Sequence, residues 1–407
     1  MAFDWISRDG KLILGARIVR TFSYGFLSII LAIYLNLVGF NEIAIGLVLT
    51  ATLVDSVIFN LISGAYADKF GRKKMLVLYA ILMIASAIIF FVTNNYVALI
   101  IAALIGTINV TGSEVGAFLS LEQAILPQTV FNIKKRTSVF AIYNTVGTFA
   151  MAGGVLMSGL STILENRYGL DKIDSIRYLF LLYAFCSVVV LVIYFLLSHN
   201  IESQKTRINS KPIALSTKSR KIIRKMSSLF AVDAFAGGFV IQSIVSFWFY
   251  TKFGADISSL SYIFATAAVL TGLSFLFASK LASKIGLVNT MVFTHIPSNV
   301  LMILLAFAPT FYVAILIYLA RMGLSQMDVP TRQSYIVAVV NEDERIAAAS
   351  ITNTSRNVAQ SVSPSLSGLI IQALSLSAPF VVGGALKIVY DVGIFLNFRK
   401  IKPPEEI

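Results

Sequence analysis

Apolar runs of about twenty residues recur along the whole chain, and this repetition restricts the fold more than any other feature. A helix of that length spans the hydrocarbon layer, where only helices and closed barrels satisfy their own backbone hydrogen bonds. Of the 407 residues, 57% are hydrophobic and 13% are charged, against roughly 25% charged in soluble domains. The sequence therefore predicts an all-α integral membrane protein with no soluble domain.

A single long polar segment, residues 198–226, divides these runs into two sets of six. We expect the spans at residues 12–38, 44–66, 75–93, 96–126, 137–163, 177–197, 227–250, 257–280, 287–308, 311–339, 346–374 and 377–397. The polar segment is rich in Lys and Arg. We therefore expect two six-helix bundles, residues 1–197 and 227–407, joined by a basic linker.

The net charge of +13 is unevenly distributed between the two sides of the predicted membrane. Most Lys and Arg lie in loops on the side of the N-terminus, whereas the opposite loops hold Arg167, Lys172, Arg177 and Lys252. By the positive-inside rule, both termini and the linker are cytoplasmic, as in a multi-pass protein of the plasma membrane. Basic loops facing anionic lipid headgroups explain the charge without a nucleic-acid partner.

The sequence contains few residues or motifs typical of enzyme active sites. One cysteine, Cys186, and two histidines give no disulfide and no metal-ligand spacing, and we find no phosphate loop or nucleophile elbow. We therefore expect no enzyme activity, no cofactor and no metal. A secondary transporter and a non-transporting receptor or scaffold remain as alternatives to a membrane-embedded enzyme.

The two halves show a weak internal repeat. Gly25-Phe26 matches Gly238-Phe239 at nearly the same spacing that relates Gln123 to Gln333. Duplicated six-helix units would produce this pattern. Chance similarity is the alternative.

The loop between the second and third spans carries the most specific pattern. It reads Gly64-Ala-Tyr-Ala-Asp-Lys-Phe-Gly-Arg-Lys-Lys74 and resembles the signature loop of the major facilitator superfamily. The matching positions are Gly64, Asp68, Lys69, Gly71, Arg72 and Lys73. The resemblance implies a fold of two pseudo-symmetric six-helix bundles, transport by alternating access as a monomer, and a latching role for this loop. The two glycines suit a tight turn and close backbone approach.

The resemblance is incomplete in two spans. Span five lacks the Gly-Pro pair of some drug/proton antiporters, and span four lacks the usual arginine near Ile105-Gly106. Both departures weaken the case for a drug antiporter.

Ionisable residues inside the spans are candidates for function, because charges are expensive in lipid. Arg20 corresponds to Asp233 under the repeat, and Glu122 corresponds to Arg332, with opposite signs in each pair. We interpret the two pairs as salt bridges of an inner gate. Static neutralisation within one half is an equally good alternative.

Three acids lie deeper in the spans and are candidates for proton coupling: Glu114 and Asp328, followed by Asp55. The resemblance places spans one, four, seven and ten around a central cavity. The substrate-cavity candidates are Arg17, Tyr24, Phe118, Gln123, Gln242, Gln333, Arg321 and Arg356. Lys387 and Asp391, four residues apart, are expected to form a structural pair, and His295 is expected to be structural.

These observations favour a transporter of a small solute, with protons as the second partner. The predicted activity is proton-coupled export of small organic molecules. The alternative is proton-coupled uptake of an organic anion or a sugar-like solute.

Overall fold

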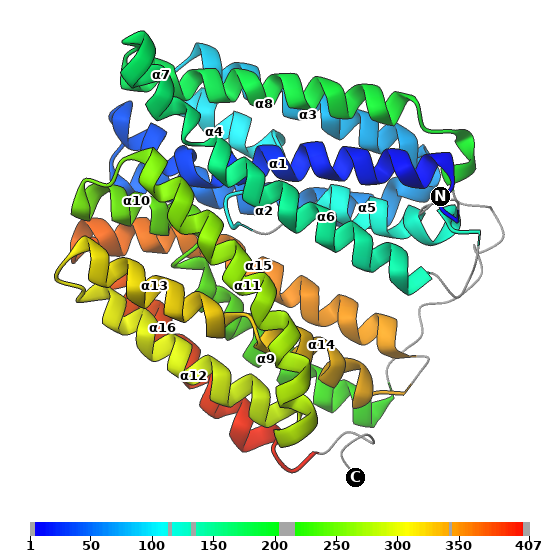
Figure 1. Cartoon of the computed structure of the whole chain (residues 1–407). Coiled ribbons are helices and arrows are strands. Elements are labelled where there is room, and N and C mark those ends of the chain that lie inside the picture. The colour runs from blue at the N-terminus through cyan, green and yellow to red at the C-terminus, as the bar shows by residue number, and fades with distance from the viewer. Residues whose placement is uncertain (1–4, 113–115, 132–135, 203–215, 342–343, 402–407) are drawn as a thin grey trace. The chain divides into compact units, whose positions relative to one another are not determined.

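The computed structural model is almost entirely helical in the residues that it describes, 5–112, 116–131, 136–202, 216–341 and 344–401 (Figure 1). The helices before the linker are α1 (Arg8–Leu37), α2 (Glu42–Phe70), α3 (Arg72–Val92), α4 (Tyr96–Ile105), α5 (Ala117–Ile125), α6 (Arg136–Met157), α7 (Leu160–Tyr168) and α8 (Lys172–Phe195). Those after it are α9 (Thr217–Gly238), α10 (Gln242–Phe253), α11 (Ile257–Ile285), α12 (Leu287–Ala306), α13 (Phe311–Ser325), α14 (Asp328–Ala338), α15 (Arg345–Ala373) and α16 (Ala378–Phe398). The predicted all-α fold is confirmed.

The helices begin and end at residues suited to those positions. The Asn41 side chain accepts a hydrogen bond from the Ala44 amide at 2.9 Å and caps α2. Gly169 and Gly254 end α7 and α10 in the left-handed conformation, at φ of 66° and 65°. Short polar caps therefore divide the apolar runs into separate helices.

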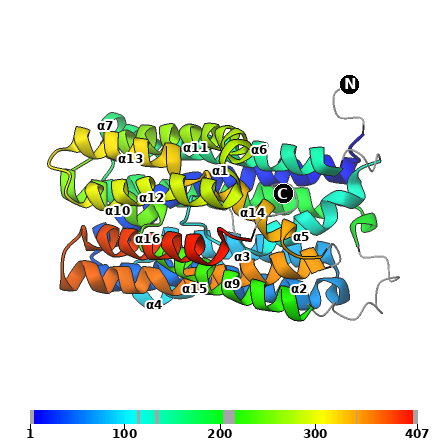
Figure 2. The ribbon, with the colours of Figure 1, turned by 90° about the horizontal axis from the view of Figure 1, so that it is seen from below.

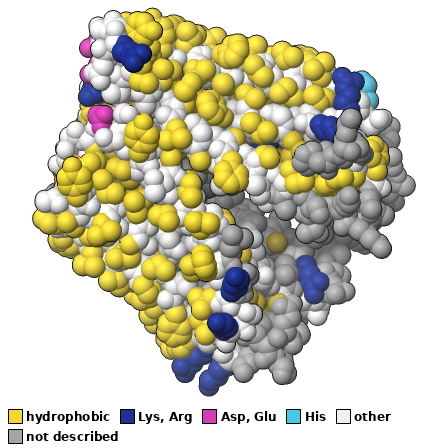
Figure 3. Space-filling view, viewed as in Figure 1, with side chains coloured by type: hydrophobic (Ala, Val, Ile, Leu, Met, Phe, Trp, Pro, Cys, Tyr) yellow, Lys and Arg dark blue, Asp and Glu magenta, His cyan; other side chains and the backbone are white. Residues whose placement is uncertain are grey.

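Apolar side chains cover the long sides of the helices. Within the described ranges, nine helical segments are long and apolar enough to cross a membrane. Phe185 on α8 and Leu316 on α13 are 65% and 70% exposed, as expected for side chains that face lipid. On the face drawn in Figure 3, Lys and Arg show near helix ends rather than along their length.

Four of the spans predicted as single helices are each divided in two, so that prediction was wrong in detail. Span four breaks between α4 and α5, where Thr107, Gly112 and Gly116 have φ of 47°, 78° and 116°. Spans five, seven and ten break between α6 and α7, α9 and α10, and α13 and α14. Pro330 lies in the first turn of α14, where its missing N–H costs no helical hydrogen bond.

The chain forms two compact units whose boundaries differ in one place from those expected. Unit 1 comprises residues 1–206 and 241–265, and unit 2 comprises residues 207–240 and 266–407. Unit 1 thus contains α10 and residues 257–265 of α11, which were expected in the second bundle, 227–407. The reason is local: the Ser243 and Ser246 hydroxyls donate to the α1 carbonyls of Ser28 and Ile29, at 2.8 and 2.9 Å.

In unit 1, α1 packs against α6 and α8 (Figure 1). α1 and α6 approach closely through glycine. A Cβ at Gly25 would overlap the Met151 carbonyl, and a Cβ at Gly154 would overlap the Phe22 carbonyl. Small residues at such crossings let helix backbones meet in membranes.

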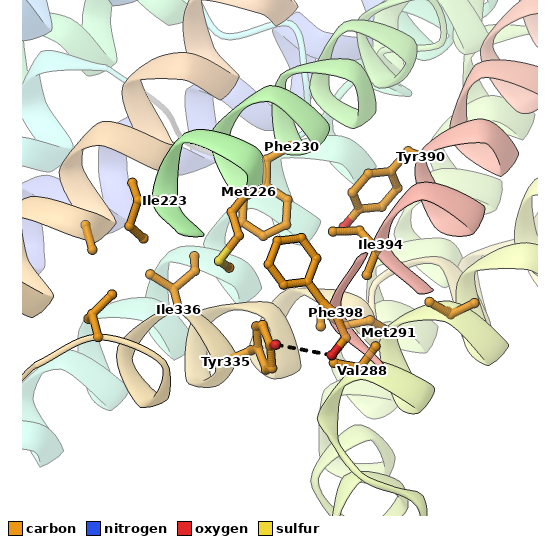
Figure 4. Close-up of a cluster of buried hydrophobic side chains, with 13 residues drawn as sticks. Ile223, Met226, Phe230, Val288, Met291, Tyr335, Ile336, Tyr390, Ile394 and Phe398 are labelled. Atoms are coloured by element: carbon orange, nitrogen blue, oxygen red, sulfur yellow. Dashed lines mark hydrogen bonds between the residues drawn. The ribbon is translucent and has the colours of Figure 1, made fainter. Parts of the chain in front are cut away.

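In unit 2, α9 lies along α15, and α12 lies along α16 (Figure 2). A cluster of buried apolar side chains from α9, α12, α14, α15 and α16 forms a core in this unit (Figure 4). Tyr335 is part of the cluster, and its hydroxyl donates to the Ile401 carbonyl at 2.9 Å, with the Phe398 carbonyl farther away at 3.5 Å. The cluster fixes α9, α14 and α16 near the charged residues described below.

Candidate functional site

Arg20 on α1 and Glu122 on α5 form the centre of a buried polar cluster in unit 1. The Arg20 guanidinium donates to both carboxylate oxygens of Glu122, at 3.0 and 2.6 Å. The Tyr143 hydroxyl on α6 and the Tyr194 hydroxyl on α8 donate to the same carboxylate, at 2.6 and 2.8 Å. Both charged side chains are 0% exposed. The ion pair is thus fully hydrogen-bonded and joins four helices.

Three of the predicted cavity residues lie at this cluster. The Arg17 guanidinium stacks 4.3 Å from the ring centre of Tyr143 and donates to its hydroxyl at 3.3 Å. The Phe118 ring centre lies 4.5 Å from the Arg20 guanidinium carbon. Tyr24, one turn beyond Arg20 on α1, is also buried. Cation–π contacts of this kind stabilise a desolvated guanidinium.

Asp55 on α2 is a second buried acid of unit 1. Unlike Glu122, it has no arginine or tyrosine bound to its carboxylate among the described residues. Its side chain is 0% exposed, and neither carboxylate oxygen has a hydrogen-bond partner among the described residues. The Thr107 amide, at the break in span four, faces the carboxylate without completing a hydrogen bond. An isolated ionised carboxylate is very costly in such surroundings. The position therefore fits a carboxyl group that carries a proton.

Asp233 on α9 is the centre of a second charged cluster, in unit 2. Its Oδ1 accepts a hydrogen bond from Lys387 on α16 at 2.6 Å. Its Oδ2 accepts from Arg356 on α15 at 2.7 Å and from Arg332 on α14 at 3.3 Å. Arg332 also donates to Asp328 at 2.7 Å. A single carboxylate therefore holds α9 to three other helices.

His295 on α12 adds a titratable group to the Asp233 cluster. Its Nδ1 lies 2.7 Å from Oδ1 of Asp391 on α16. The Asn299 side-chain amide donates to the other oxygen of Asp391 at 2.9 Å. On the opposite side of the ring, Nε2 lies 3.9 Å from Oδ1 of Asp233. The imidazole thus stands between two buried carboxylates.

The predicted inner-gate residues all have partners within their own units. Arg20 pairs with Glu122 in unit 1, and Arg332 pairs with Asp233 in unit 2. This is the arrangement of the alternative interpretation, neutralisation within one half. The gate pairs Arg20/Asp233 and Glu122/Arg332 would each join two units, and they stay predictions.

The three coupling candidates have different surroundings. Glu114 lies outside the described residues. Asp328 is paired with Arg332, whereas Asp55 has no partner among the described residues. Of the two described candidates, only Asp328 therefore has an ionic partner, and the coupling roles of all three acids stay predictions.

The remaining cavity candidates are spread over both units. Gln123 and Gln333 are exposed. Gln242 on α10 donates to the Ser28 hydroxyl at 2.9 Å in unit 1. In unit 2, Arg356 is used by Asp233, whereas Arg321 contacts the Met322 sulfur at 3.5 Å and has no acidic partner among the described residues.

The signature loop forms a tight turn at the start of α3. Gly71 adopts a φ of 100°, which only glycine adopts readily, and it connects α2 directly to α3. The Glu202 carboxylate accepts hydrogen bonds from the backbone amides of Arg72 and Lys73, at 2.6 and 3.2 Å. The Lys73 ammonium donates to the carbonyls of Phe195 and Leu197, at 2.9 and 2.5 Å. The loop is therefore tied to the end of α8 and the residues after it.

The other signature residues lie in the last turns of α2. Lys69 is exposed, and the side chain of Asp68 lies outside the described part of the chain. A Cβ at Gly64 would meet no described atom within 4 Å. The close backbone approach expected at Gly64 is thus not seen in unit 1.

Glu344 binds the N-terminus of a helix in unit 2, as Glu202 does in unit 1. Its carboxylate accepts hydrogen bonds from the Ser219 hydroxyl, at 2.5 Å, and from the Ser216 amide, at the N-terminus of α9. The Ser219 hydroxyl and then the Ser216 amide lower the pKa of Glu344 to about 2. Both units therefore hold a helix N-terminus with a glutamate distant in sequence.

Sequence reasoning missed several residues of the two clusters. The predicted Lys387–Asp391 pair was wrong: Lys387 binds Asp233, and Asp391 binds His295. The prediction used only the i,i+4 spacing within one helix. In the structure, each of the two residues instead bonds to a side chain on a neighbouring helix. The sequence did not indicate that Tyr143 and Tyr194 bind Glu122, because tyrosines are common in apolar spans.

Buried, hydrogen-bonded charges inside a multi-pass helical membrane protein, together with the signature loop, are features expected of a transporter of small solutes. A family model described as Major Facilitator Superfamily matches residues 13–324 and, in a second match, residues 248–407. The chain belongs to this superfamily, and the predicted family and fold are confirmed.

Two relatives of known sequence are similar to most of the chain. An uncharacterized membrane protein of Saccharomyces cerevisiae, YJR124C, is 26% identical over 96% of this chain and 94% of its own length. The multidrug resistance protein MdtG of Dickeya zeae is 23% identical over 87% of this chain and 84% of its own length.

Among solved structures, the nucleoside transporter NupG has the same fold, with a TM-score of 0.74 over 96% of this chain and 99% of its own at 15% identity. A D-xylose-proton symporter gives a TM-score of 0.72 over 98% of both chains at 15% identity.

Proposed function

We propose that this transporter exports small organic molecules by alternating access, driven by protons, as a monomer in the plasma membrane. The observation that carries proton coupling is the carboxylate of Asp55, which is buried and has no partner among the described residues. A carboxyl group that is neutral there and ionised when water reaches it would couple proton release to a conformational change. The names of the MdtG relatives, multidrug resistance proteins, support export of organic molecules.

Reconstituted protein tests the coupling. Proteoliposomes containing ethidium, a small organic cation, are given an imposed pH gradient, and initial flux is followed by fluorescence. We expect the gradient to accelerate wild-type flux. Asp55→Asn should abolish the acceleration while retaining substrate exchange at equal pH. Asp174→Asn, which changes an exposed acid in the first turn of α8, is the matched control and should behave as wild type.

Asp328 and Glu114 stay in the proposal as further coupling sites. Their amide variants are measured in the same assay. Wild-type gradient dependence in Asp55→Asn, Asp328→Asn and Glu114→Gln would remove the proposed carboxylate coupling.

The second candidate is proton-coupled uptake of an organic anion or a sugar-like solute. Arg321 supports the anion, because its guanidinium has no acidic partner among the described residues. Counterflow of radiolabelled benzoate and of D-xylose separates the candidates. Saturable benzoate counterflow that Arg321→Gln removes, without ethidium flux, would replace export by anion uptake.

The proposed orientation has both termini and the linker in the cytoplasm. Cys186→Ala gives a cysteine-free background, in which Asn166→Cys and Lys221→Cys are compared in intact cells. We expect an impermeant maleimide to label position 166 and to leave position 221 unlabelled. Labelling of position 221 from outside would reverse the orientation.

A further inference from the structure

We propose that the C-terminal end of α16 carries a binding site for an anionic phospholipid, with Lys225, Arg399 and Lys400 around the phosphate and α16 along the acyl chains. Lys225 lies on α9, and Arg399 and Lys400 directly follow α16. All three side chains are exposed. The inference goes beyond the proposed transport and depends neither on the solute nor on proton coupling.

The apolar part of the site is an exposed stripe along α16. Val389, Val392 and Leu396 are 63%, 45% and 64% exposed. They follow one another at steps of three and four residues, so they share one face of the helix. Arg399 is three residues beyond Leu396, and the stripe therefore ends in a cation. A phospholipid presents its groups in the same order, acyl chains in the hydrocarbon layer and a charged headgroup at its edge.

Aromatic rings of α12 and α16 connect the stripe to the cations. The ring centres of Phe293 and Phe395 are 5.9 Å apart, and Phe293 is 57% exposed beside the stripe. The guanidinium carbon of Arg399 lies 5.2 Å from the centre of the Phe395 ring. This cation–π contact restrains the guanidinium next to the apolar surface, where its N–H groups can bind a phosphate.

Lys225 adds a cation from a second helix. Its ammonium donates to the side-chain oxygen of Asn397 at 3.4 Å. Because Asn397 directly follows Leu396, this contact places Lys225 at the end of α16 that also carries Arg399 and Lys400. The site thus combines cations from α9 and α16 with an apolar surface from α12 and α16.

Cations at the end of a helix often compensate its unpaired carbonyl groups, and this is the structural alternative. At α16 other groups do so. The Phe398 carbonyl accepts from the Ile401 amide at 2.9 Å, and the Tyr335 hydroxyl donates to the Ile401 carbonyl at 2.9 Å. The end of α16 is therefore held without the three cations.

Unit 2 offers these cations no exposed acid in the part that the structure describes. The acids described there are at most 4% exposed: Asp233, Asp328, Glu344 and Asp391. Each is already bound inside the charged cluster or at the start of α9. An anionic headgroup supplies the missing negative charge. Each Lys or Arg near the membrane surface should strengthen its binding about fivefold.

Brominated lipids test the site in the full-length protein. A bimane fluorophore is attached at Leu396→Cys in the Cys186→Ala background. Leu316→Cys, on α13 and 70% exposed, is the matched control. In mixed nanodiscs, we expect brominated phosphatidylglycerol to bind at position 396 about fivefold or more tightly than brominated phosphatidylcholine, and equally at position 316. Equal quenching by the two lipids at position 396 would overturn the proposal.

Charge variants test the residues. Arg399→Gln with Lys400→Gln should reduce the preference for phosphatidylglycerol by at least about fivefold, whereas Arg399→Lys should retain it. Arg167→Gln removes an exposed cation from unit 1 and should change nothing. Melting temperatures confirm that each variant is folded. A preference that survives the double variant would remove Arg399 and Lys400 from the site.

Two competing occupants give different results. Glu405 and Glu406 follow the site in the sequence and lie outside the described residues. If they occupied it, wild type would show no lipid preference and Glu405→Gln with Glu406→Gln would gain one. If the site bound a free anion, excess inorganic phosphate would abolish the preference. Either result would overturn lipid binding, and we expect neither change.

Discussion

The guanidinium of Arg20 and the carboxylate of Glu122 meet through two parallel hydrogen bonds, of 3.0 and 2.6 Å, with both side chains fully buried. Such a bidentate pair compensates for the loss of hydration of both groups only while both partners are present. The two residues therefore act on stability as one unit.

Removing one partner should destabilise the protein far more than removing both. Arg20→Met or Glu122→Gln should each lower the free energy of unfolding by about 3–5 kcal/mol, because an uncompensated charge or an unused guanidinium stays buried. The double variant Arg20→Met/Glu122→Met should lose much less. Denaturant unfolding in detergent measures all three.

The exposed pair of Asp174 and Arg177, 2.9 Å apart, is the control. Asp174→Ala, at the more exposed partner, should cost about 0–1 kcal/mol. Equal losses at the buried and exposed pairs would mean that the Arg20–Glu122 contact does not stabilise unit 1.

Charge swaps distinguish the inner gate from static neutralisation. If the contact within unit 1 is the functional one, Arg20→Glu with Glu122→Arg should restore the transport that either single variant loses. If Arg20 also closes a gate with Asp233, Arg20→Asp with Asp233→Arg should restore it instead. Rescue is read from initial flux and from spin-label distances at the helix ends. Failure of the second swap with success of the first would remove the gate.

Two neighbouring glycines on α6 should respond differently to the same change. A Cβ at Gly154 would overlap the Phe22 carbonyl, whereas a Cβ at Gly153 would meet Phe22 Cδ2 at 3.8 Å, an ordinary contact. Gly154→Ala should therefore cost about 1–3 kcal/mol through overpacking, and Gly153→Ala should be close to neutral. Thermal unfolding of the two variants side by side decides this. Similar melting temperatures would contradict the close approach of α1 and α6.

The turn at Gly71 offers a second such comparison. At a φ of 100°, Gly71→Ala should destabilise the turn between α2 and α3 by about 1 kcal/mol or more. Gly64→Ala, inside α2 and open to space among the described residues, should be neutral or stabilising by up to about 1 kcal/mol. The melting temperatures and the flux of both variants are the measurements. A loss of flux in Gly64→Ala without a loss of stability would indicate a contact made only during transport.

Stability at acidic pH should report the cap that Glu344 provides for α9. The hydrogen bonds from Ser219 and Ser216 lower its pKa from 4.5 to about 2. A depressed pKa contributes stability that is fully present above the unfolded value and is lost as the pH falls towards the folded value. The difference in melting temperature between wild type and Glu344→Gln should be constant above about pH 5 and shrink below it. A difference that keeps its size down to about pH 3 would contradict the assigned bonds.

Sequence reasoning predicted the helices well because lipid admits few other structures. Hydropathy could not show the breaks in spans four, five, seven and ten, since a broken helix keeps the same composition. The charged residues were recognised one by one, but the partners were not. Asp233 attracts three cations from three helices, and no spacing along the chain reveals which ones meet. The packing of the helices, rather than the spacing along α16, determines that Lys387 binds Asp233 and that Asp391 binds His295.

The hydrogen bonds from α10 to α1 have a consequence for biosynthesis. Since residues 241–265 belong to unit 1 and residues 207–240 to unit 2, the growing chain leaves unit 1 and later returns to it. Unit 1 is complete in the growing chain only when residue 265 has been synthesised, after residues 207–240 of unit 2. A nascent chain ending after α9 would thus hold an α1 that still lacks Ser243 and Ser246 against it. The packing of unit 1 is therefore finished only after the first helix of unit 2 has been synthesised.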